Sequence, residues 1–205
     1  MTGFSVEPIT FSCLEILRRL PWPDVPNSAD SDKEIVQAGV LLPISYGSSG
    51  LSVVLTRRSL RVVNHKDEMC FPGGVKEPSD IDIQRTALRE AFEELGIIPD
   101  DVKILGRLHP VSTNSGFRVW PVVGYIPPCY GFQINSDEVS EVIEVPLSSF
   151  CSEEGFRQEA VLEDGSLRKR YSFVYGGRVI HGATARILGR FMRIVAERLP
   201  EGALL

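Results

Sequence analysis

The segment from Asp82 to Gly96 constrains the fold most strongly, because its residues follow the repeat of an amphipathic α-helix. At 100° per residue, Glu90, Glu93 and Glu94 fall within a sector of about 100°. The apolar residues group on the opposite side of the helix (Leu88, Ala91, Phe92 and Leu95). One face is therefore acidic, and the other face is suited to packing on a hydrophobic core.

Short runs of β-branched and aliphatic residues lie on both sides of this helix and predict strands. They occupy residues 38–44, 51–56, 102–108, 119–126 and 139–145. Two further helices are predicted, over residues 11–20 and 183–199, with a hairpin turn at Gly176-Gly177. Ser79 or Asp80 is the expected N-cap of the acidic helix. We therefore expect an α/β fold in which helices enclose a mixed central sheet as an α/β/α sandwich.

Composition limits both the architecture and the class of partner. The chain has 205 residues, of which 43% are hydrophobic, so it can bury one core. We expect a helix and loop extension over residues 1–33 and one globular domain over residues 34–199, as a monomer or a homodimer. The net charge of -5 argues against a general nucleic-acid-binding surface.

The expected location is a soluble, intracellular one. No apolar run approaches the roughly 20 residues of a membrane helix, so we expect no membrane partner. The four cysteines form no C-x-x-C pair, which favours reduced thiols. Arg18 and Arg19 leave a mitochondrial presequence open beside a cytoplasmic location, and the chain does not end in S-K-L.

The acidic face has the chemistry of a metal site. Mg²⁺ prefers oxygen ligands and keeps several waters, so carboxylates on one helix face can hold it against substrate phosphates. Glu90, Glu93 and Glu94 are the candidates, and Arg89 lies one turn before Glu93, where it can orient that carboxylate. The alternative is a solvated acidic face with no ligand. The sequence around the helix distinguishes the two.

That surrounding sequence resembles the Nudix box, G-x5-E-x7-R-E-U-x-E-E-x-G-U, in which U is a bulky aliphatic residue. The matching run is Gly73-Gly74, a loop, and Arg89-Glu90-x-x-Glu93-Glu94-x-Gly96-Ile97. Counted from Gly74, the first acid of the box falls on Asp80, eight rather than seven residues then precede Arg89, and Ala91 replaces the aliphatic residue.

The resemblance implies a Nudix hydrolase that uses Mg²⁺ or Mn²⁺. Glu90 and Glu94 are the implied metal ligands, Glu93 is a third ligand with a catalytic role, and the carbonyl of Gly73 is a backbone ligand. Arg89 is the implied catalytic arginine. By resemblance to the coenzyme A pyrophosphatase branch of this family, Glu138 in Asp137-Glu138-Val139 is the downstream base or an extra metal ligand, with Glu141 and Glu144 as reserves.

The sequence segments that precede the box resemble the signature of the coenzyme A pyrophosphatase branch, L-L-T-x-R-S-x3-R-x3-G-x3-F-P-G-G. They are Val54-Leu55-Thr56-Arg57-Arg58-Ser59, His65 and Phe71-Pro72-Gly73-Gly74. The second arginine of the signature is replaced by Val63 and its glycine by Asp67.

Arg58, Arg57, Ser59 and His65 are the implied substrate contacts, since guanidinium groups bind phosphate oxygens bidentately. The alternative is that the arginines are solvated and that His65 is structural.

The implied reaction is metal-dependent hydrolysis of the diphosphate bridge of coenzyme A or acyl-CoA. The products are 3′,5′-ADP and 4′-phosphopantetheine, or its acylated form. Two alternatives stay open. The same helix can serve a hydrolase of ADP-ribose, a dinucleoside polyphosphate or a nucleoside triphosphate, and a Nudix-fold binding module without catalysis is a further possibility.

Overall fold

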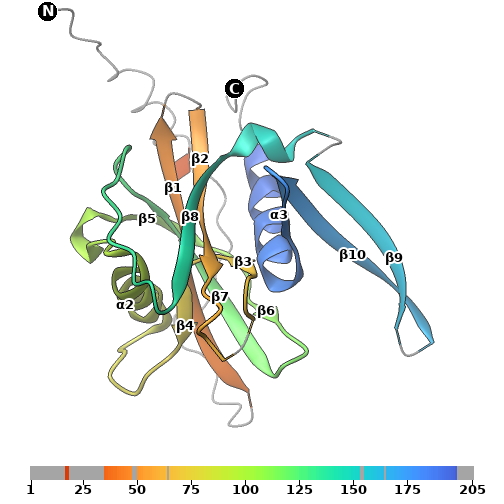
Figure 1. Cartoon of the computed structure of the whole chain (residues 1–205), viewed down its shortest axis with the longest axis horizontal. Helices are drawn as coiled ribbons and strands as arrows, with labels where there is room; N and C mark the ends of the chain where they lie inside the picture. Colours follow the sequence, from red (N-terminus) through yellow and green to blue (C-terminus); the bar gives the residue numbers. More distant parts are fainter. Residues whose placement is uncertain are drawn as a thin grey trace, which may run out of the picture.

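A mixed sheet lies between two helices in the computed structural model, which describes residues 17–18, 35–47, 50–63, 65–152, 155–163 and 165–197 (Figure 1). The main strands are β1 (Val36–Gly47), β2 (Gly50–Arg58), β5 (Lys103–Arg107), β7 (Phe117–Tyr125) and β8 (Val139–Pro146). The short strands are β3 (Met69–Cys70), β4 (Gly73–Val75) and β6 (Val111–Ser112). The helices are α2 (Ile83–Leu95) and α3 (Gly182–Ala196).

The sheet has the order β3-β2-β1-β7-β5, with β4 paired to β1, β6 to β7 and β8 to β2. Strands β1 and β7 run parallel from Val36↔Phe117 to Ile44↔Tyr125, and the other pairs in this sheet are antiparallel. The expected mixed α/β architecture is therefore confirmed. The turns η1 (Pro99–Asp101) and η2 (Leu147–Phe150) follow α2 and β8.

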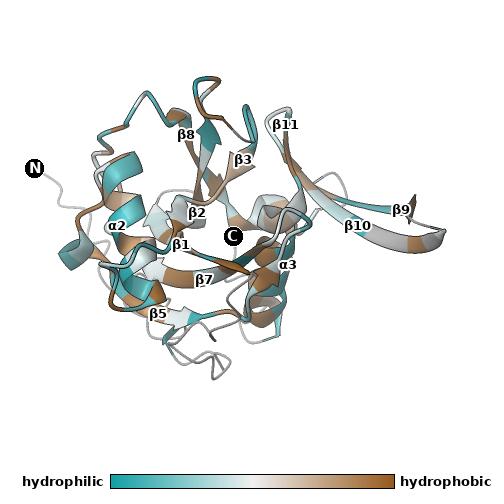
Figure 2. Ribbon diagram, turned by 90° about the horizontal axis from the view of Figure 1, so that it is seen from below, coloured by the Kyte–Doolittle hydropathy of each residue, from teal (hydrophilic) through white to brown (hydrophobic). Residues whose placement is uncertain are grey.

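Successive side chains of the strands point to opposite faces of the sheet, and each face packs into its own hydrophobic core. On β2, Val53 and Leu55 join the core under α3, whereas Val54 joins the core under α2. In Figure 2, α2 turns a hydrophilic side outward and an apolar side toward the sheet. At the end of β2, Arg57 pairs with Asp67, whereas Arg58 approaches Glu94 of α2.

A second sheet extends away from the main one (Figure 1). It has the order β11-β10-β9 and comprises β9 (Phe156–Glu163), β10 (Ser166–Tyr175) and β11 (Arg178–Ile180). The turn predicted at Gly176-Gly177 joins β10 to β11, which confirms that hairpin. The sequence reasoning missed the longer β9–β10 hairpin, because its described side chains are mostly exposed and lack one clear apolar face in a single strand.

Several predicted boundaries need correction. The N-cap of α2 is Asp82 rather than Ser79 or Asp80, since the Asp82 side chain accepts a hydrogen bond from the Arg85 backbone N–H at 2.8 Å. Phe92 was assigned to the core face but is 52% exposed. Of the helix predicted over residues 11–20, only residues 17 and 18 are described; both are helical, and Leu17 is buried. None of the helices in the described ranges is long and apolar enough to span a membrane.

Candidate active site

The two glycines of β4 lie close to β1 on one side and to helix α2 on the other. A Cβ on Gly73 would lie 2.5 Å from the carbonyl oxygen of Gly39, and a Cβ on Gly74 would lie 2.5 Å from the carboxylate of Glu90. Both distances are shorter than a van der Waals contact. At Gly73 the neighbour is the backbone of β1, so this position needs a residue without a side chain; at Gly74 the neighbour is the end of the flexible Glu90 side chain, which would have to move. The antiparallel pairing of β4 with β1 therefore places the backbone of the glycine pair against the acidic face of α2.

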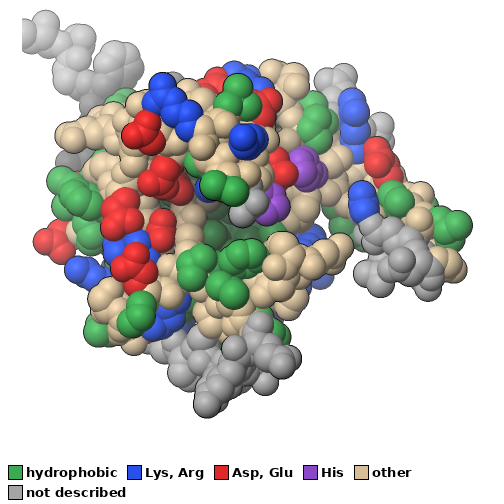
Figure 3. Space-filling model, turned by 60° about the horizontal axis from the view of Figure 1, so that its bottom comes forward, with side chains coloured by type: hydrophobic (Ala, Val, Ile, Leu, Met, Phe, Trp, Pro, Cys, Tyr) green, Lys and Arg blue, Asp and Glu red, His purple; other side chains and the backbone are tan. Residues whose placement is uncertain are grey.

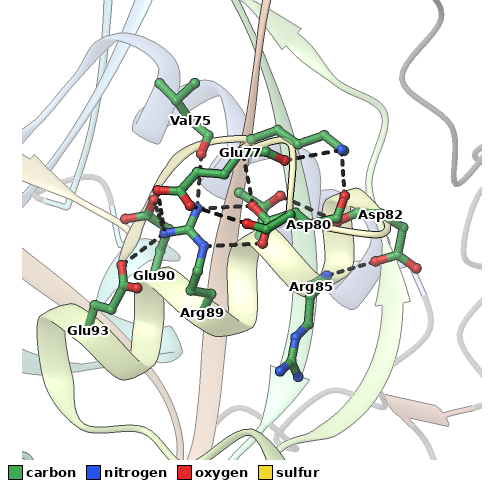
Figure 4. A network of polar contacts seen from close by, with 11 residues as sticks. Val75, Glu77, Asp80, Asp82, Arg85, Arg89, Glu90 and Glu93 are labelled. Atoms are coloured by element: carbon green, nitrogen blue, oxygen red, sulfur yellow. Dashed lines mark hydrogen bonds and ion pairs between the residues drawn. The ribbon is translucent and has the colours of Figure 1, made fainter.

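Arg89 organises the carboxylates at the start of this face (Figure 4). Its guanidinium donates to both oxygens of Asp80, from Nε at 3.2 Å and from Nη2 at 3.0 Å. Its Nη1 lies 2.9 Å from both Glu90 Oε1 and Glu93 Oε2, and Nη2 also donates to the Val75 carbonyl at 3.1 Å. Arg89 thus fixes two candidate ligands and ties them to the loop before α2.

Asp80 is the buried partner in this network, with 4% of its surface exposed. Burial opposes its ionisation, but hydrogen bonds from Arg89 and from the Glu77 backbone N–H outweigh that effect. The pKa of Asp80 therefore lies below its usual value, and the residue carries a negative charge at neutral pH. Sequence reasoning left the role of Asp80 open, and the structure places it as the anchor of Arg89.

Glu94 is the most buried acid of the helix, with 2% of its surface exposed. Burial raises its pKa to about 8; Arg58 and a backbone hydrogen bond with Gly73 oppose the shift, whereas the charges of Glu90 and Glu138 add to it. Burial also raises the pKa of Glu90, against the effect of Arg89. The structure therefore brings three acids of the predicted site close enough to repel one another.

Two buried polar atoms at this point have no hydrogen-bond partner among the described residues. They are Glu94 Oε2 and Arg58 Nε. Arg58 Nη1 lies 3.9 Å from Glu94 Oε1, at the margin of an ion pair. A buried carboxylate oxygen without a donor is costly unless a cation or a proton satisfies it.

The donor set fits a hard divalent cation. Glu90 and Glu94 supply carboxylate oxygens, one of them unsatisfied, in a setting where negative charges repel one another. In the described part of the chain, no three His, Cys, Asp or Glu side chains already form a metal cage, and the ligand set stays a prediction. Glu93 is half-exposed and bound to Arg89, so its oxygens point first to that guanidinium.

Glu138, the predicted base, lies on the segment before β8. Its carboxylate accepts a hydrogen bond from Asn135 Nδ2 at 3.3 Å, and its backbone carbonyl accepts one from the Ser59 N–H at 2.8 Å. Its charge raises the pKa of Glu90 and of Glu94, which places it beside the acidic face. The structure thus brings this residue, 44 positions beyond Glu94 in sequence, to the site.

The reserve acids lie elsewhere. Glu141 is opposite Arg57 on the paired strands and binds the guanidinium of Arg178. Glu144 accepts a hydrogen bond from Ser45 Oγ at 3.0 Å. Glu141 and Glu144 are thus bound to side chains outside the acidic face, whereas the charge of Glu138 acts on Glu90 and Glu94, which favours Glu138.

The predicted substrate contacts divide into two groups. Arg58 points to the acidic face, where it approaches Glu94. Arg57 pairs instead with Asp67, at 2.8 Å, on the α3 side of the sheet. Ser59 is buried, and its hydroxyl accepts the backbone N–H of Arg61 at 3.2 Å, which stabilises the loop after β2. His65 Nδ1 lies 3.1 Å from Glu68 Oε2, in an exposed pair.

One neighbour of the site was missed from the sequence. Cys70 Sγ lies 3.2 Å from Thr56 Oγ1, and the charges of Glu94 and Arg58 both act on the thiol. Burial raises its pKa to about 11, so the thiol stays protonated and uncharged beside the acidic face. Its place immediately before Phe71-Pro72-Gly73-Gly74 was the available signal.

Charged side chains lie at the left, the top and the right of the face shown in Figure 3. Acidic and basic groups form a mixed patch at the left of that view, and histidine side chains lie apart from it across a hollowed region. Arg89 holds the carboxylates of α2 in place, and Arg58 lies beside them at the end of β2. Such a combination of acidic and basic groups can bind a cation together with a phosphorylated ligand.

Comparisons with known proteins identify the family of the chain. A model described as NUDIX domain matches residues 36–165. The chain is 39% identical over 151 residues to a protein named uncharacterized Nudix hydrolase NudL from Photorhabdus laumondii, covering 74% of this chain and 80% of that relative.

The fold is also similar to two solved structures. One is a Nudix hydrolase from M. smegmatis, RenU, with a TM-score of 0.55 and 15% identity, covering 80% of this chain and 88% of that one. The other is the NUDIX domain of Shewanella oneidensis NrtR complexed with ADP ribose, with a TM-score of 0.50 and 20% identity, covering 84% of this chain and 94% of that one. At these identities the likeness concerns the fold.

Proposed function

The chain belongs to the NUDIX family and is a Nudix pyrophosphohydrolase, and on this premise we propose that it hydrolyses the diphosphate bridge of coenzyme A or acyl-CoA. The products are 3′,5′-ADP and 4′-phosphopantetheine, or its acylated form. The Nudix domain extends over residues 34–199 in this proposal, with residues 1–33 as an extension. The protein acts as a monomer or a homodimer.

The observation that carries the catalytic part is the buried carboxylate of Glu94. Its Oε2 has no partner among the described residues, and burial raises its pKa to about 8. A divalent cation removes both penalties, because it supplies the missing partner and favours the charged carboxylate. Glu90 and Glu94 are the proposed ligands, Glu93 is a third, and the backbone of Gly73 lies beside them.

Mg²⁺ or Mn²⁺, when bound, would supply Lewis-acid chemistry: it polarises the diphosphate and lowers the pKa of the attacking water. The protein residues then position the reactants. Arg89, held by Asp80, keeps Glu90 and Glu93 in place. Arg58 offers a guanidinium to the phosphate oxygens from the end of β2.

Hydrolysis requires a base beside this site. The water oxygen forms a bond to one phosphorus, the bridging oxygen leaves with the other phosphate, and the water proton must be accepted. Glu138 is the proposed acceptor, since its charge acts on both Glu90 and Glu94. Asn135 donates a hydrogen bond to the Glu138 carboxylate and so fixes its orientation.

The choice of coenzyme A as the substrate rests on two sequence segments in and around β2 and β3. The run from Val54 to Ser59 and the run Phe71-Pro72-Gly73-Gly74 resemble the coenzyme A pyrophosphatase signature. Arg58 in the first run approaches Glu94, and Gly74 in the second lies beside Glu90. Hydrolysis of ADP-ribose, a dinucleoside polyphosphate or a nucleoside triphosphate remains the alternative, because the acidic face recognises the diphosphate that these substrates share.

A substrate panel tests the proposal. Coenzyme A, acetyl-CoA, ADP-ribose, a dinucleoside polyphosphate and a nucleoside triphosphate are incubated with Mg²⁺ or Mn²⁺, and the products are identified by mass. We expect release of 3′,5′-ADP from coenzyme A or acetyl-CoA, and its loss when a chelator is added. Turnover of only the other substrates would refute the coenzyme A assignment, and metal-dependent turnover of none would support the binding-module alternative.

A further inference from the structure

Strand β8 lies along β2 (Figure 1), and the pairing of the two strands contains one irregularity. The register is regular as far as Arg57↔Glu141, and the next pair is Arg58↔Val139. Ser140 is therefore an extra residue on β8, which makes a β-bulge. Bulges change the direction of the side chains beside them and are frequent next to active sites.

The bulge decides which face of the sheet the start of β8 covers. Val139 and Val142 are three residues apart, so in a regular strand their side chains would point to opposite faces. Both instead pack in the hydrophobic core under α2, Val139 as a buried member and Val142 at its margin. The extra residue accounts for this packing, because it shifts the alternation of side chains by one position.

The bulge also sets the position of Glu138. The backbone N–H of Ser59 donates to the carbonyl of Glu138 at 2.8 Å, so these two residues lie opposite each other beyond the bulge. Without the extra residue, Val139 would lie opposite Ser59, and Glu138 would lie about 3.3 Å further along the strand. The place of Glu138 beside Glu90 and Glu94 therefore depends on the bulge.

The side chain of Ser140 fastens the bulge to β2. Its hydroxyl lies 3.2 Å from the Arg57 carbonyl oxygen and 3.5 Å from the Arg58 carbonyl oxygen, and its single proton is shared between them. The extra residue interrupts the ladder of backbone hydrogen bonds, so this contact replaces part of what the ladder loses. Ser140 is exposed and adds little packing, so these hydrogen bonds are the contribution of its side chain.

We propose that Ser140 is a positioning residue, whose hydroxyl closes the bulge and so holds Glu138 beside the acidic face. The inference rests on the proposed function, in which Glu138 accepts the proton of the attacking water. Arg58 is held from the other side as well, because its N–H donates to the Glu68 carbonyl at 3.0 Å. Loss of the Ser140 hydroxyl should therefore affect turnover more than substrate binding.

Ser140→Ala removes the hydroxyl and keeps the length of the bulge. A displacement of a catalytic group by about 1 Å can lower a rate about 10²-fold, and a partial loosening should cost less. We expect kcat to fall about tenfold and KM to change by less than about twofold. Threonine keeps the hydroxyl and suits a strand, so Ser140→Thr should retain kcat within about threefold. A single hydrogen bond contributes little to stability, so the urea midpoint of Ser140→Ala should fall by no more than about 0.5 M.

A double-mutant cycle separates positioning from a general structural role. The values of kcat and KM are measured with metal and coenzyme A for the wild type, Ser140→Ala, Ser140→Thr, Glu138→Gln and Ser140→Ala/Glu138→Gln. Without the Glu138 carboxylate there is no base to position, so Ser140→Ala should then lower kcat by less than about a further twofold. Ser112→Ala, at an exposed serine of β6, is the matched control and should leave kcat unchanged.

Amide hydrogen exchange at Ser59, followed by NMR, is a second readout that needs no turnover. The Ser59 N–H is bonded to the Glu138 carbonyl, so its exchange reports how firmly the Glu138 segment is held. We expect exchange at least about threefold faster in Ser140→Ala than in the wild type, and unchanged exchange in Ser112→Ala.

A lower kcat in Ser140→Ala with a nearly unchanged KM, its rescue by threonine, its absence in the Glu138→Gln background and faster exchange at Ser59 would together support the proposal. An unaltered kcat in Ser140→Ala, an equal loss in the Glu138→Gln background or unaltered exchange at Ser59 would overturn it, while the wild type still hydrolyses coenzyme A. A wild type that does not hydrolyse coenzyme A with either metal would refute the proposed function itself, and the kinetic role of Ser140 with it.

Discussion

Replacement of Asp80 by asparagine tests the organisation of the site. The substitution keeps the size of the side chain but removes the charge that binds Arg89 through two hydrogen bonds. Loss of one partner from a buried ion pair destabilises a protein by about 3–5 kcal/mol. Arg89 keeps its contacts with Glu93 and with the Val75 carbonyl, so we expect a decrease of about 2–4 kcal/mol in the free energy of unfolding.

Urea denaturation of Asp80→Asn beside Asp137→Asn measures this effect. Asp137 pairs with Arg61 at 2.6 Å, but their side chains are 78% and 69% exposed, so its loss should change stability by less than about 1 kcal/mol. Because the folded-state pKa of Asp80 is lowered, its stabilisation is present above the unfolded pKa and is lost as pH falls through the folded pKa.

The difference between wild type and Asp80→Asn should therefore be full at neutral pH and narrow below about pH 4. We also expect turnover to fall about 10–100-fold, as for other residues that orient metal ligands. Equal and small losses of stability in Asp80→Asn and Asp137→Asn would refute the assignment of Asp80 as the anchor of Arg89.

Three further predictions concern the acidic face. In Gly74→Ala the new Cβ displaces the Glu90 carboxylate, so activity should fall at least tenfold with little change in the denaturation midpoint, whereas Gly47→Ala, with open space around it, should leave both unchanged. The pKa of Glu94 is raised, so its carboxyl group holds a proton in the folded protein at pH values where the unfolded chain has lost it. In the presence of chelator, the free energy of unfolding of the wild type should therefore fall by a few kcal/mol between about pH 5 and about pH 8. Glu94→Gln should remove this pH dependence. Glu138→Gln should lower kcat about 10²-fold with little effect on KM, and an unaltered kcat would exclude it as the base.

Local patterns were sufficient to predict the main elements. The helical repeat ending at Gly96 predicted α2, and β-branched runs predicted the central strands, because burial on a sheet or under a helix imposes a short period on the sequence. The cap was misplaced because Asp80 and Asp82 are equally suitable by type. Their difference is tertiary: Asp80 binds Arg89, which leaves Asp82 to cap the helix.

Contacts between distant segments were harder to predict. The pairing of Arg89 with Glu93 follows from helical spacing, but the approach of Arg58 to Glu94 joins β2 to α2 and has no local signature. Glu93 and Glu94 are consecutive, but Glu94 is buried and Glu93 is half-exposed. The sequence placed both on one acidic face, and only the packing of β3 and β4 distinguishes their surroundings.

The release of 3′,5′-ADP from coenzyme A by the wild type and by Glu94→Gln, with Mg²⁺ or Mn²⁺ and with product identification by mass, tests the central claim most directly. The account predicts metal-dependent release by the wild type, loss of that release in chelator, and a rate at least about 10²-fold lower in a folded Glu94→Gln protein. Equal rates in the two proteins, or no release of 3′,5′-ADP by the wild type with either metal, would contradict it.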